Sequence, residues 1–175
     1  LGNVLNLGTA DFSFSYWINL PDITNAPIMT KTEDNDNNIN NYFSAEKIAF
    51  QERADAQTVC GHAGTTNMTA LENTWVHVCK TADRDGNTAI YVNGTTDTYG
   101  RSLHDMEYDT QDLDNTASWM FMRGAGSQYT QGFMTDVAFF NVALSADEVA
   151  EIYNGGIPFD ITTHGQSSAL TGYWR

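Results

Sequence analysis

Large hydrophobic residues occupy alternate positions along much of this chain. The clearest segment is residues 12–20, in which every second residue is large and apolar: Phe12, Phe14, Tyr16, Ile18 and Leu20. Successive side chains of a β-strand point to opposite faces, so this pattern predicts a strand with one buried face. Similar short runs lie at residues 26–31, 42–45, 47–52, 58–62, 75–81, 88–94, 119–123 and 132–141. Clusters of Asn, Asp, Gly and Thr separate the runs, which is typical of an all-β sandwich or jelly roll.

A single α-helix is predicted near residues 145–154. Ser145 can cap its first turn, and Glu148 three residues later completes a capping box. The Asn-Gly-Gly sequence at 154–156 ends the helix, and Pro158 prevents it from resuming. A helix of about ten residues is barely stable alone in water, so we expect it to pack on the sandwich.

The composition predicts one folded domain over residues 1–175. The longest polar stretch, residues 32–41, is too short to separate two domains. Eight Lys and Arg against 22 Asp and Glu give a net charge of −14. Such a chain repels phosphate backbones and anionic lipid, which argues against a nucleic-acid-binding or membrane-surface protein. No apolar run reaches the length of a membrane span, so membrane insertion is not expected.

The chain begins at Leu1, with neither Met nor a signal peptide. We therefore expect a processed product or a part of a longer protein. Its many Asn, Asp and Thr residues and few Lys residues suit an extracellular, cell-surface or virion-surface setting.

Two segments resemble a known family. Residues 74–94 read TWVHVCKTADRDGNTAIYVNG, and residues 132–156 read GFMTDVAFFNVALSADEVAEIYNGG. They resemble the concanavalin A-like jelly-roll family, in particular its laminin-G-like and pentraxin-like domains. There a W-x-H-v strand leads through a hairpin to a y-V-dG strand, and a later strand–helix unit carries G-x-i-D and aLS-x-x-E-i. The resemblance implies a two-sheet antiparallel jelly roll, with residues 169–175 as a last strand beside the N-terminus.

Oxygen-bearing side chains crowd residues 32–38, and calcium prefers such ligands. The segment is not an EF-hand, because Ile39 replaces the required Gly and Ala45 the bidentate Glu. In the pentraxin branch an Asp-Asn pair after the corresponding strand binds calcium, which implies a counterpart here. The resemblance implies Asp34, Asn35 and Asp136 as metal ligands, and the oxygen-rich loop adds Asp36. The alternative is a solvated loop, with Asp136 hydrogen-bonded to a neighbouring loop.

The cysteines allow two states. By resemblance, Cys79 occupies a position that pentraxins use in a core disulfide, but the partner strand carries Ser15 and Tyr16 here. The only intrachain pair is Cys60 with Cys79, which needs adjacent strands. The sequence therefore allows either a Cys60–Cys79 disulfide or two buried thiols. The four histidines lack metal-ligand spacing, and we expect His77 to pack within the sheet.

Aromatic and amide side chains near the late loops suggest where a ligand binds. Sugar rings present flat C–H faces, which Tyr and Trp rings can cover while offering a polar edge. The aromatic candidates are Tyr99, Tyr108, Trp119 and Tyr129, each of which could instead belong to the core. The predicted ligand-binding residues are Tyr108, Gln128, Tyr129 and Gln131.

Catalysis is not expected. Glycosidases of this superfamily present paired carboxylates from one strand, in a pattern like E-x-D-x-x-E, which this chain lacks. Glu107 and Asp109 are two residues apart but fall in a polar stretch that reads as a loop. We therefore predict a non-catalytic module that recognises a glycan or a neighbouring protein. The alternatives are a structural decoration or assembly domain, which would form a homo-oligomer or part of a larger particle, and a glycoside hydrolase.

Overall fold

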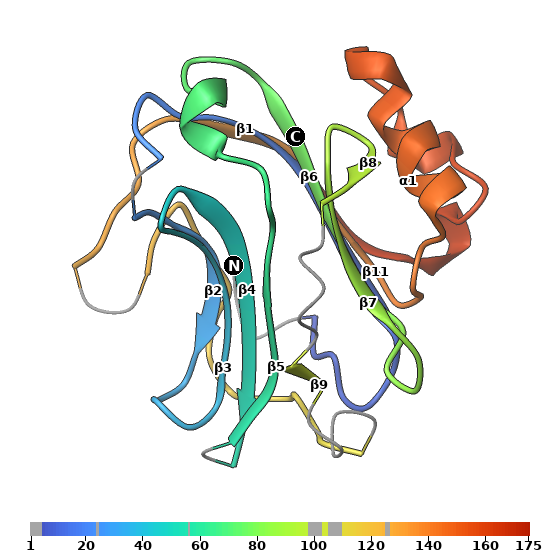
Figure 1. Cartoon of the computed structure of the whole chain (residues 1–175). Coiled ribbons are helices and arrows are strands. Elements are labelled where there is room, and N and C mark those ends of the chain that lie inside the picture. Colours follow the sequence, from blue (N-terminus) through green and yellow to red (C-terminus); the bar gives the residue numbers. More distant parts are fainter. Residues whose placement is uncertain (1–4, 24, 56, 98–102, 105–109, 125–126) are drawn as a thin grey trace.

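The protein is a sandwich of two six-stranded antiparallel sheets, as expected for the jelly roll (Figure 1). The computed structural model describes residues 5–23, 25–55, 57–97, 103–104, 110–124 and 127–175. Sheet A has the strand order β12 (Leu170–Trp174), β11 (Phe133–Phe140), β1 (Phe12–Asn19), β6 (Val76–Ala82), β7 (Thr88–Val92) and β8 (Thr95–Thr96). Sheet B has the order β10 (Met120–Phe121), β2 (Pro27–Thr32), β3 (Asn38–Ser44), β4 (Lys47–Ala54), β5 (Gln57–Ala63) and β9 (Leu103–His104).

The main core lies between the two sheets. The alternation predicted for the first strand is confirmed, since the inward side chains of β1 are all buried there: Phe12, Phe14, Tyr16 and Ile18. Trp119 is only 1% exposed, and its ring packs edge-on against Phe14 and Phe139 at centroid distances of 5.5 and 4.9 Å. It belongs to the core and is therefore not a platform for a sugar.

A second, smaller core lies between the outer face of sheet A and the helix α1 (Ala146–Tyr153). The predicted capping box is confirmed, because Glu148 N donates to Ser145 Oγ and Ser145 N donates to Glu148 Oε2. Val149 and Ile152 then face the sheet and are fully buried. Four short 3-10 helices complete the described helices: Met68–Leu71, Asn154–Gly156, Ile161–Thr163 and Ser167–Ala169. No helix in the described ranges is long and apolar enough to cross a membrane.

Strand β3 begins at Asn38, four residues before the predicted run at 42–45. Asparagine is unusual in strands, so the hydrophobic pattern missed this part. Asn41 is nevertheless fully buried, because its Nδ2 donates a 2.6 Å hydrogen bond to Tyr16 Oη across the sandwich. The last strand, β12, pairs with β11 at the edge of sheet A, and Leu5 of the N-terminal segment lies against Gly172.

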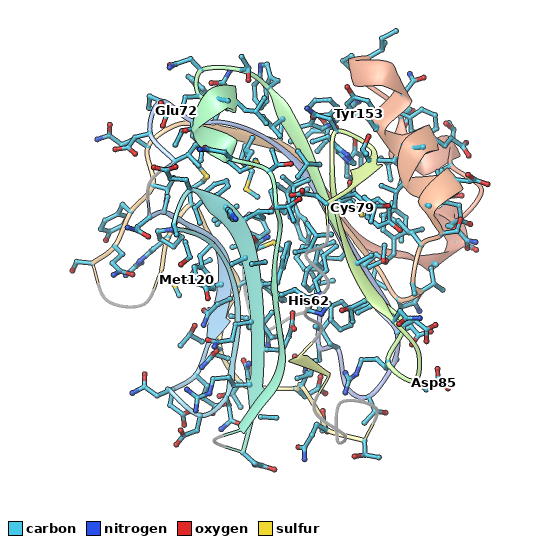
Figure 2. All side chains as sticks on the ribbon, viewed as in Figure 1. His62, Glu72, Cys79, Asp85, Met120 and Tyr153 are labelled. Carbon is cyan, nitrogen blue, oxygen red and sulfur yellow. The ribbon has the colours of Figure 1, made fainter. Side chains whose placement is uncertain are left out.

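Cys79 is a free, buried thiol. It faces the second core on the α1 side of sheet A (Figure 2), whereas Cys60 belongs to β5 of sheet B. A bridge between them is therefore not formed. The register pairs Cys79 with Ser15, the residue expected in place of the pentraxin partner.

Candidate functional site

A cleft with a volume of about 330 Å³, lined by both polar and apolar residues, lies on the outer face of sheet B. Side chains that alternate with the core residues of β3 and β4 point into it. Thr30 of β2 pairs with Asn40 of β3, and Asn40 pairs with Gln51 of β4, so these three residues form a row across the sheet. Tyr42 lies two residues along β3 on the same face. The cleft thus offers hydroxyl and amide groups beside an aromatic ring.

The segment that follows β10 folds back and forms one side of this cleft. Met122 N donates to Ile28 O at 2.7 Å, and Thr30 Oγ1 donates to Arg123 O at 3.0 Å, which fixes the segment against β2. Gly124 N donates to Gln128 O, which places Gln128 at the cleft. A side chain at Gly124 would come within 2.9 Å of Gln128 Oε1, so glycine permits this close approach.

Tyr129 and Gln131 line a second hollow of about 510 Å³, which adjoins the cleft. The two hollows share Asn25 and Ala26 and therefore adjoin each other; together they are called the depression on sheet B. Tyr129 is 65% exposed, and the Arg123 guanidinium lies over its ring at 5.3 Å. This cation–π contact favours one orientation of an aromatic side chain that would otherwise move freely in solvent.

The structure therefore brings together three of the four predicted ligand-binding residues: Gln128, Tyr129 and Gln131. Tyr108 lies outside the described residues, as do Tyr99, Glu107 and Asp109. Sequence reasoning missed Asn40, Tyr42 and Gln51, which face the same depression. Their signal is weak: they are polar residues at alternate positions of strands that are buried on the other side.

The chemistry of the depression suits an uncharged polar ligand. Amide groups donate and accept hydrogen bonds, and tyrosine rings provide flat apolar surface. Asp22 is the single carboxylate among the described lining residues. Glycoside hydrolysis needs two carboxylates that flank the bond, so these residues do not form that machinery.

The four predicted metal ligands do not meet in one site. Asp34 lies in the exposed turn between β2 and β3, where its Oδ1 accepts hydrogen bonds from Asp36 N and Asn37 N, both at 2.8 Å. These bonds lower the pKa of Asp34. Asn35 and Asp36 are exposed in the same turn. Asp136 belongs to β11 of sheet A, where its Oδ1 accepts from Tyr173 Oη at 2.5 Å and Arg175 Nε at 3.1 Å. Asp136 is thus hydrogen-bonded to strand β12 and the residue that follows it, rather than to a neighbouring loop.

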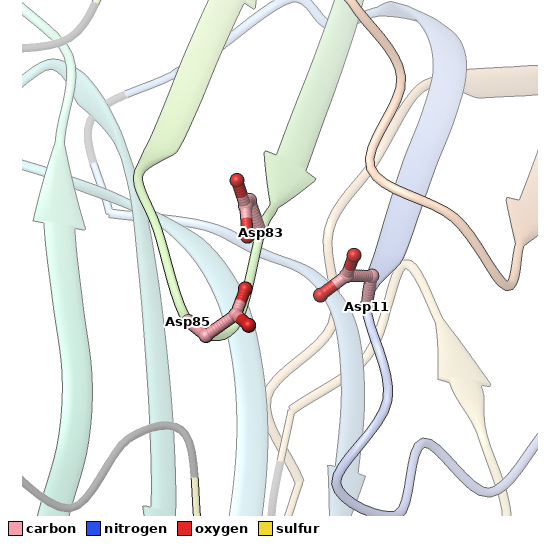
Figure 3. A group of neighbouring side chains, drawn as sticks. All are labelled: Asp11, Asp83 and Asp85. Atoms are coloured by element: carbon pink, nitrogen blue, oxygen red, sulfur yellow. The ribbon is translucent and has the colours of Figure 1, made fainter.

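A different group of carboxylates does come together. Oxygen atoms of Asp11, Asp83 and Asp85 lie within 4.8 Å of one another, where the hairpin between β6 and β7 meets the start of β1 (Figure 3). Burial, a hydrogen bond with Asp85 and the neighbouring charges raise the pKa of Asp83. Asp11 is 72 positions from Asp83 in the chain, so sequence spacing could not reveal the group. It could hold a cation through three carboxylate oxygens.

Comparison with known proteins identifies the fold independently. A family model described as "Concanavalin A-like lectin/glucanases superfamily", Laminin_G_3, matches residues 1–150. No curated protein sequence matches the chain.

Solved structures with the same fold include a Bacteroides ovatus protein described as a candidate carbohydrate-binding protein. It is 21% identical, with a TM-score of 0.69 over 96% of this chain and 46% of that one. The binding domain of botulinum neurotoxin DC in complex with rat synaptotagmin II is 17% identical, with a TM-score of 0.61 over 83% of this chain and 36% of that one. The same toxin domain in complex with SialylT is 17% identical, with a TM-score of 0.62 over 83% of this chain and 35% of that one. The chain thus spans less than half the length of each of these structures.

Proposed function

The chain belongs to the concanavalin A-like lectin/glucanase superfamily, and we propose that it is a non-catalytic module that binds a glycan in the depression on sheet B. One observation carries the proposal: the exposed Tyr129 ring stands beside a depression lined by amides and hydroxyls. A sugar ring could stack on Tyr129 while its hydroxyl groups bond to Gln51 and Gln128. The similar structures include proteins described as binding carbohydrate or solved with a bound partner, which supports a binding role.

A glycan-array screen followed by calorimetry tests the proposal. We expect binding to at least one glycan and a loss of about tenfold or more in affinity for Tyr129→Ala, because stacking on the ring contributes about 1.4 kcal/mol or more. Tyr129→Phe keeps the ring and should bind nearly as the wild type does. Asp147→Asn, on the exposed side of α1, is the matched control and should leave affinity unchanged.

Two outcomes would contradict the glycan proposal. The first is binding that Tyr129→Ala does not weaken. The second is the absence of any glycan ligand together with capture of a protein that Tyr129→Ala abolishes, which would favour the protein-recognition alternative. Hydrolysis of a polysaccharide by the purified chain would show that the module is an enzyme after all.

The surroundings of the module are also part of the proposal. We place it on a secreted, cell-surface or virion-surface protein, which its acidic surface and polar composition support. The rival is a decoration or assembly domain, which would need a large apolar surface for self-association. Sedimentation velocity tests the rival, because an assembly domain should form larger species as its concentration rises, and a chain that stays monomeric would argue against it.

Calcium binding to this module remains a prediction. Its support is the acidic triad of Asp11, Asp83 and Asp85, in which a divalent ion would relieve carboxylate repulsion. Melting in millimolar calcium should then exceed melting in a chelator, and Asp85→Asn should erase the difference. If Asp34→Ala or Asp136→Ala erases it instead, the ion binds where the sequence predicted. Identical melting curves with and without calcium would refute both sites.

A further inference from the structure

Aromatic side chains also gather on the outer face of sheet A, away from the depression on sheet B. Trp75 directly precedes β6 and is 47% exposed; Phe133 begins β11 and is 69% exposed. Their ring centroids are 6.5 Å apart. Trp17 of β1 lies one step further along this face and stacks on Tyr153 of α1 at 5.7 Å. These rings lie at the end of the sandwich where β1 ends and β6 begins, the upper end in Figure 1.

A groove of about 320 Å³ lies beside these rings. It is lined by Trp17 and Trp75 together with Gly156 and Pro158 of the segment after α1. The polar groups that line it are the Thr135 hydroxyl and the Asp136 carboxylate. A groove with two indoles and only two polar side chains is suited to a ligand that has both apolar faces and hydroxyl groups.

A β-bulge places both polar groups in the groove. Ser15 pairs with Ala138 but Trp17 pairs with Thr135, so β11 has one extra residue at this point. Met134 and Val137 both pack on the main core, and Thr135 and Asp136 between them both face outward. Asp136 has a φ of +50°, a left-handed conformation that non-glycine residues seldom adopt. Bulges of this kind redirect side chains and are frequent next to functional sites.

The Asp136 carboxylate is held in a fixed orientation. Tyr173 Oη and Arg175 Nε both donate to Oδ1, whereas Oδ2 accepts only a long 3.3 Å bond from Thr135 Oγ1 among the contacts of the described residues. Oδ2 therefore retains capacity to accept a hydrogen bond from a ligand hydroxyl.

We infer that this groove is a second saccharide-binding site, which takes an uncharged sugar. The inference rests on the proposed glycan-binding function and assigns it a further site on the opposite sheet. The indoles would cover the C–H faces of a sugar ring, and Thr135 and Asp136 would bond to its hydroxyl groups. Arg175 pairs with Asp136 and offsets its charge, so it is the net charge of −14 that disfavours sialylated and other acidic sugars.

Intrinsic tryptophan fluorescence tests this site separately from the Tyr129 depression. Trp119 is buried in the main core, and Trp174 packs against that core. Trp17 and Trp75 line the groove, so theirs are the indoles that a ligand there would contact. The probes are neutral oligosaccharides of glucose, galactose, mannose and N-acetylglucosamine, with lactose and sialyllactose as a neutral and acidic pair. We expect a saturable emission change with at least one neutral probe, and a weaker change or none with sialyllactose than with lactose.

Variants assign the emission change to the groove. Trp75→Ala should weaken binding by about tenfold, equivalent to about 1.4 kcal/mol, whereas Trp75→Phe should retain most of the affinity. Thr135→Val, which keeps the side-chain shape, should also weaken binding. Tyr129→Ala should leave this titration unchanged, so failure of the first site does not obscure the second. The inference is overturned if no neutral probe changes the emission, if Trp75→Ala leaves affinity unchanged, or if sialyllactose binds more tightly than lactose.

Discussion

Replacing Lys80 with methionine should destabilise the fold more than most single substitutions. Lys80 Nζ forms an ion pair with Glu52 Oε1 between β6 of sheet A and β4 of sheet B, and both side chains are fully buried. The ammonium lies 5.4 and 5.3 Å from the ring centroids of Phe12 and Phe50, so it is surrounded by apolar groups. Glu52 Oε2 has no hydrogen-bond partner in the described part of the chain. Lys80→Met would therefore leave a carboxylate in the core with no opposing charge.

The size of the effect follows from the cost of a buried, unpaired charge. Breaking a buried pair by removing one partner costs about 3–5 kcal/mol, whereas replacing both partners with apolar residues is often neutral or stabilising. A domain is stable by roughly 5–15 kcal/mol in total, so Lys80→Met would remove a large share. For a chain of this size the loss corresponds to a fall of about 6–20 °C in melting temperature.

Urea denaturation of four proteins measures the effect: the wild type, Lys80→Met, Glu52→Leu and the double variant. Each single variant should lose several kcal/mol, and the double variant should recover most of that loss, giving a large coupling free energy. The reasoning is refuted if Lys80→Met lowers the free energy of unfolding by less than about 1 kcal/mol, or if the double variant is no more stable than the less stable of the two single variants.

Three further predictions follow from buried or crowded titratable groups. Burial lowers the pKa of His77 from 6.5 to about 4, so between these pH values the unfolded chain binds a proton that the folded chain does not. The free energy of unfolding should therefore fall by up to about 3 kcal/mol from pH 6.5 to pH 4, and urea denaturation of His77→Gln should show a smaller fall. The raised pKa of Asp83 means that its ionisation costs stability as pH rises. Asp85→Asn should therefore increase the free energy of unfolding at pH 7 by roughly 0.5 kcal/mol after solvent screening, and by much less near pH 4. The melting temperature should rise accordingly, and an unchanged or lower value at pH 7 would argue against repulsion. Burial also raises the pKa of Cys79, so in a Cys60→Ser background the thiol should react with a disulfide reagent only after unfolding, and rapid labelling of the native protein would contradict its burial.

Local patterns in the sequence were sufficient for the architecture. The period-two runs identify the strands, because a half-buried strand must alternate apolar and polar residues whatever it packs against. The capping box at Ser145 and Glu148 identifies the start of α1, because its hydrogen bonds join residues only three positions apart. Gln128 and Tyr129 were singled out with the help of the family resemblance, which implies ligands near the late loops, and the structure places both beside the depression on sheet B.

The rest depends on residues that only the folded chain brings together. The first half of β3 was missed because the burial of Asn41 depends on a hydrogen bond to Tyr16 across the sandwich. The placement of Asp136 in the groove depends on a bulge, which arises from the register between β1 and β11 and has no signal in either strand alone. The ion pair of Lys80 with Glu52 joins two sheets and two residues that are 28 positions apart in the chain, and the sequence around either residue does not predict it. A sequence therefore determines which face of each element is apolar, whereas register and the meeting of two sheets decide which polar groups become neighbours.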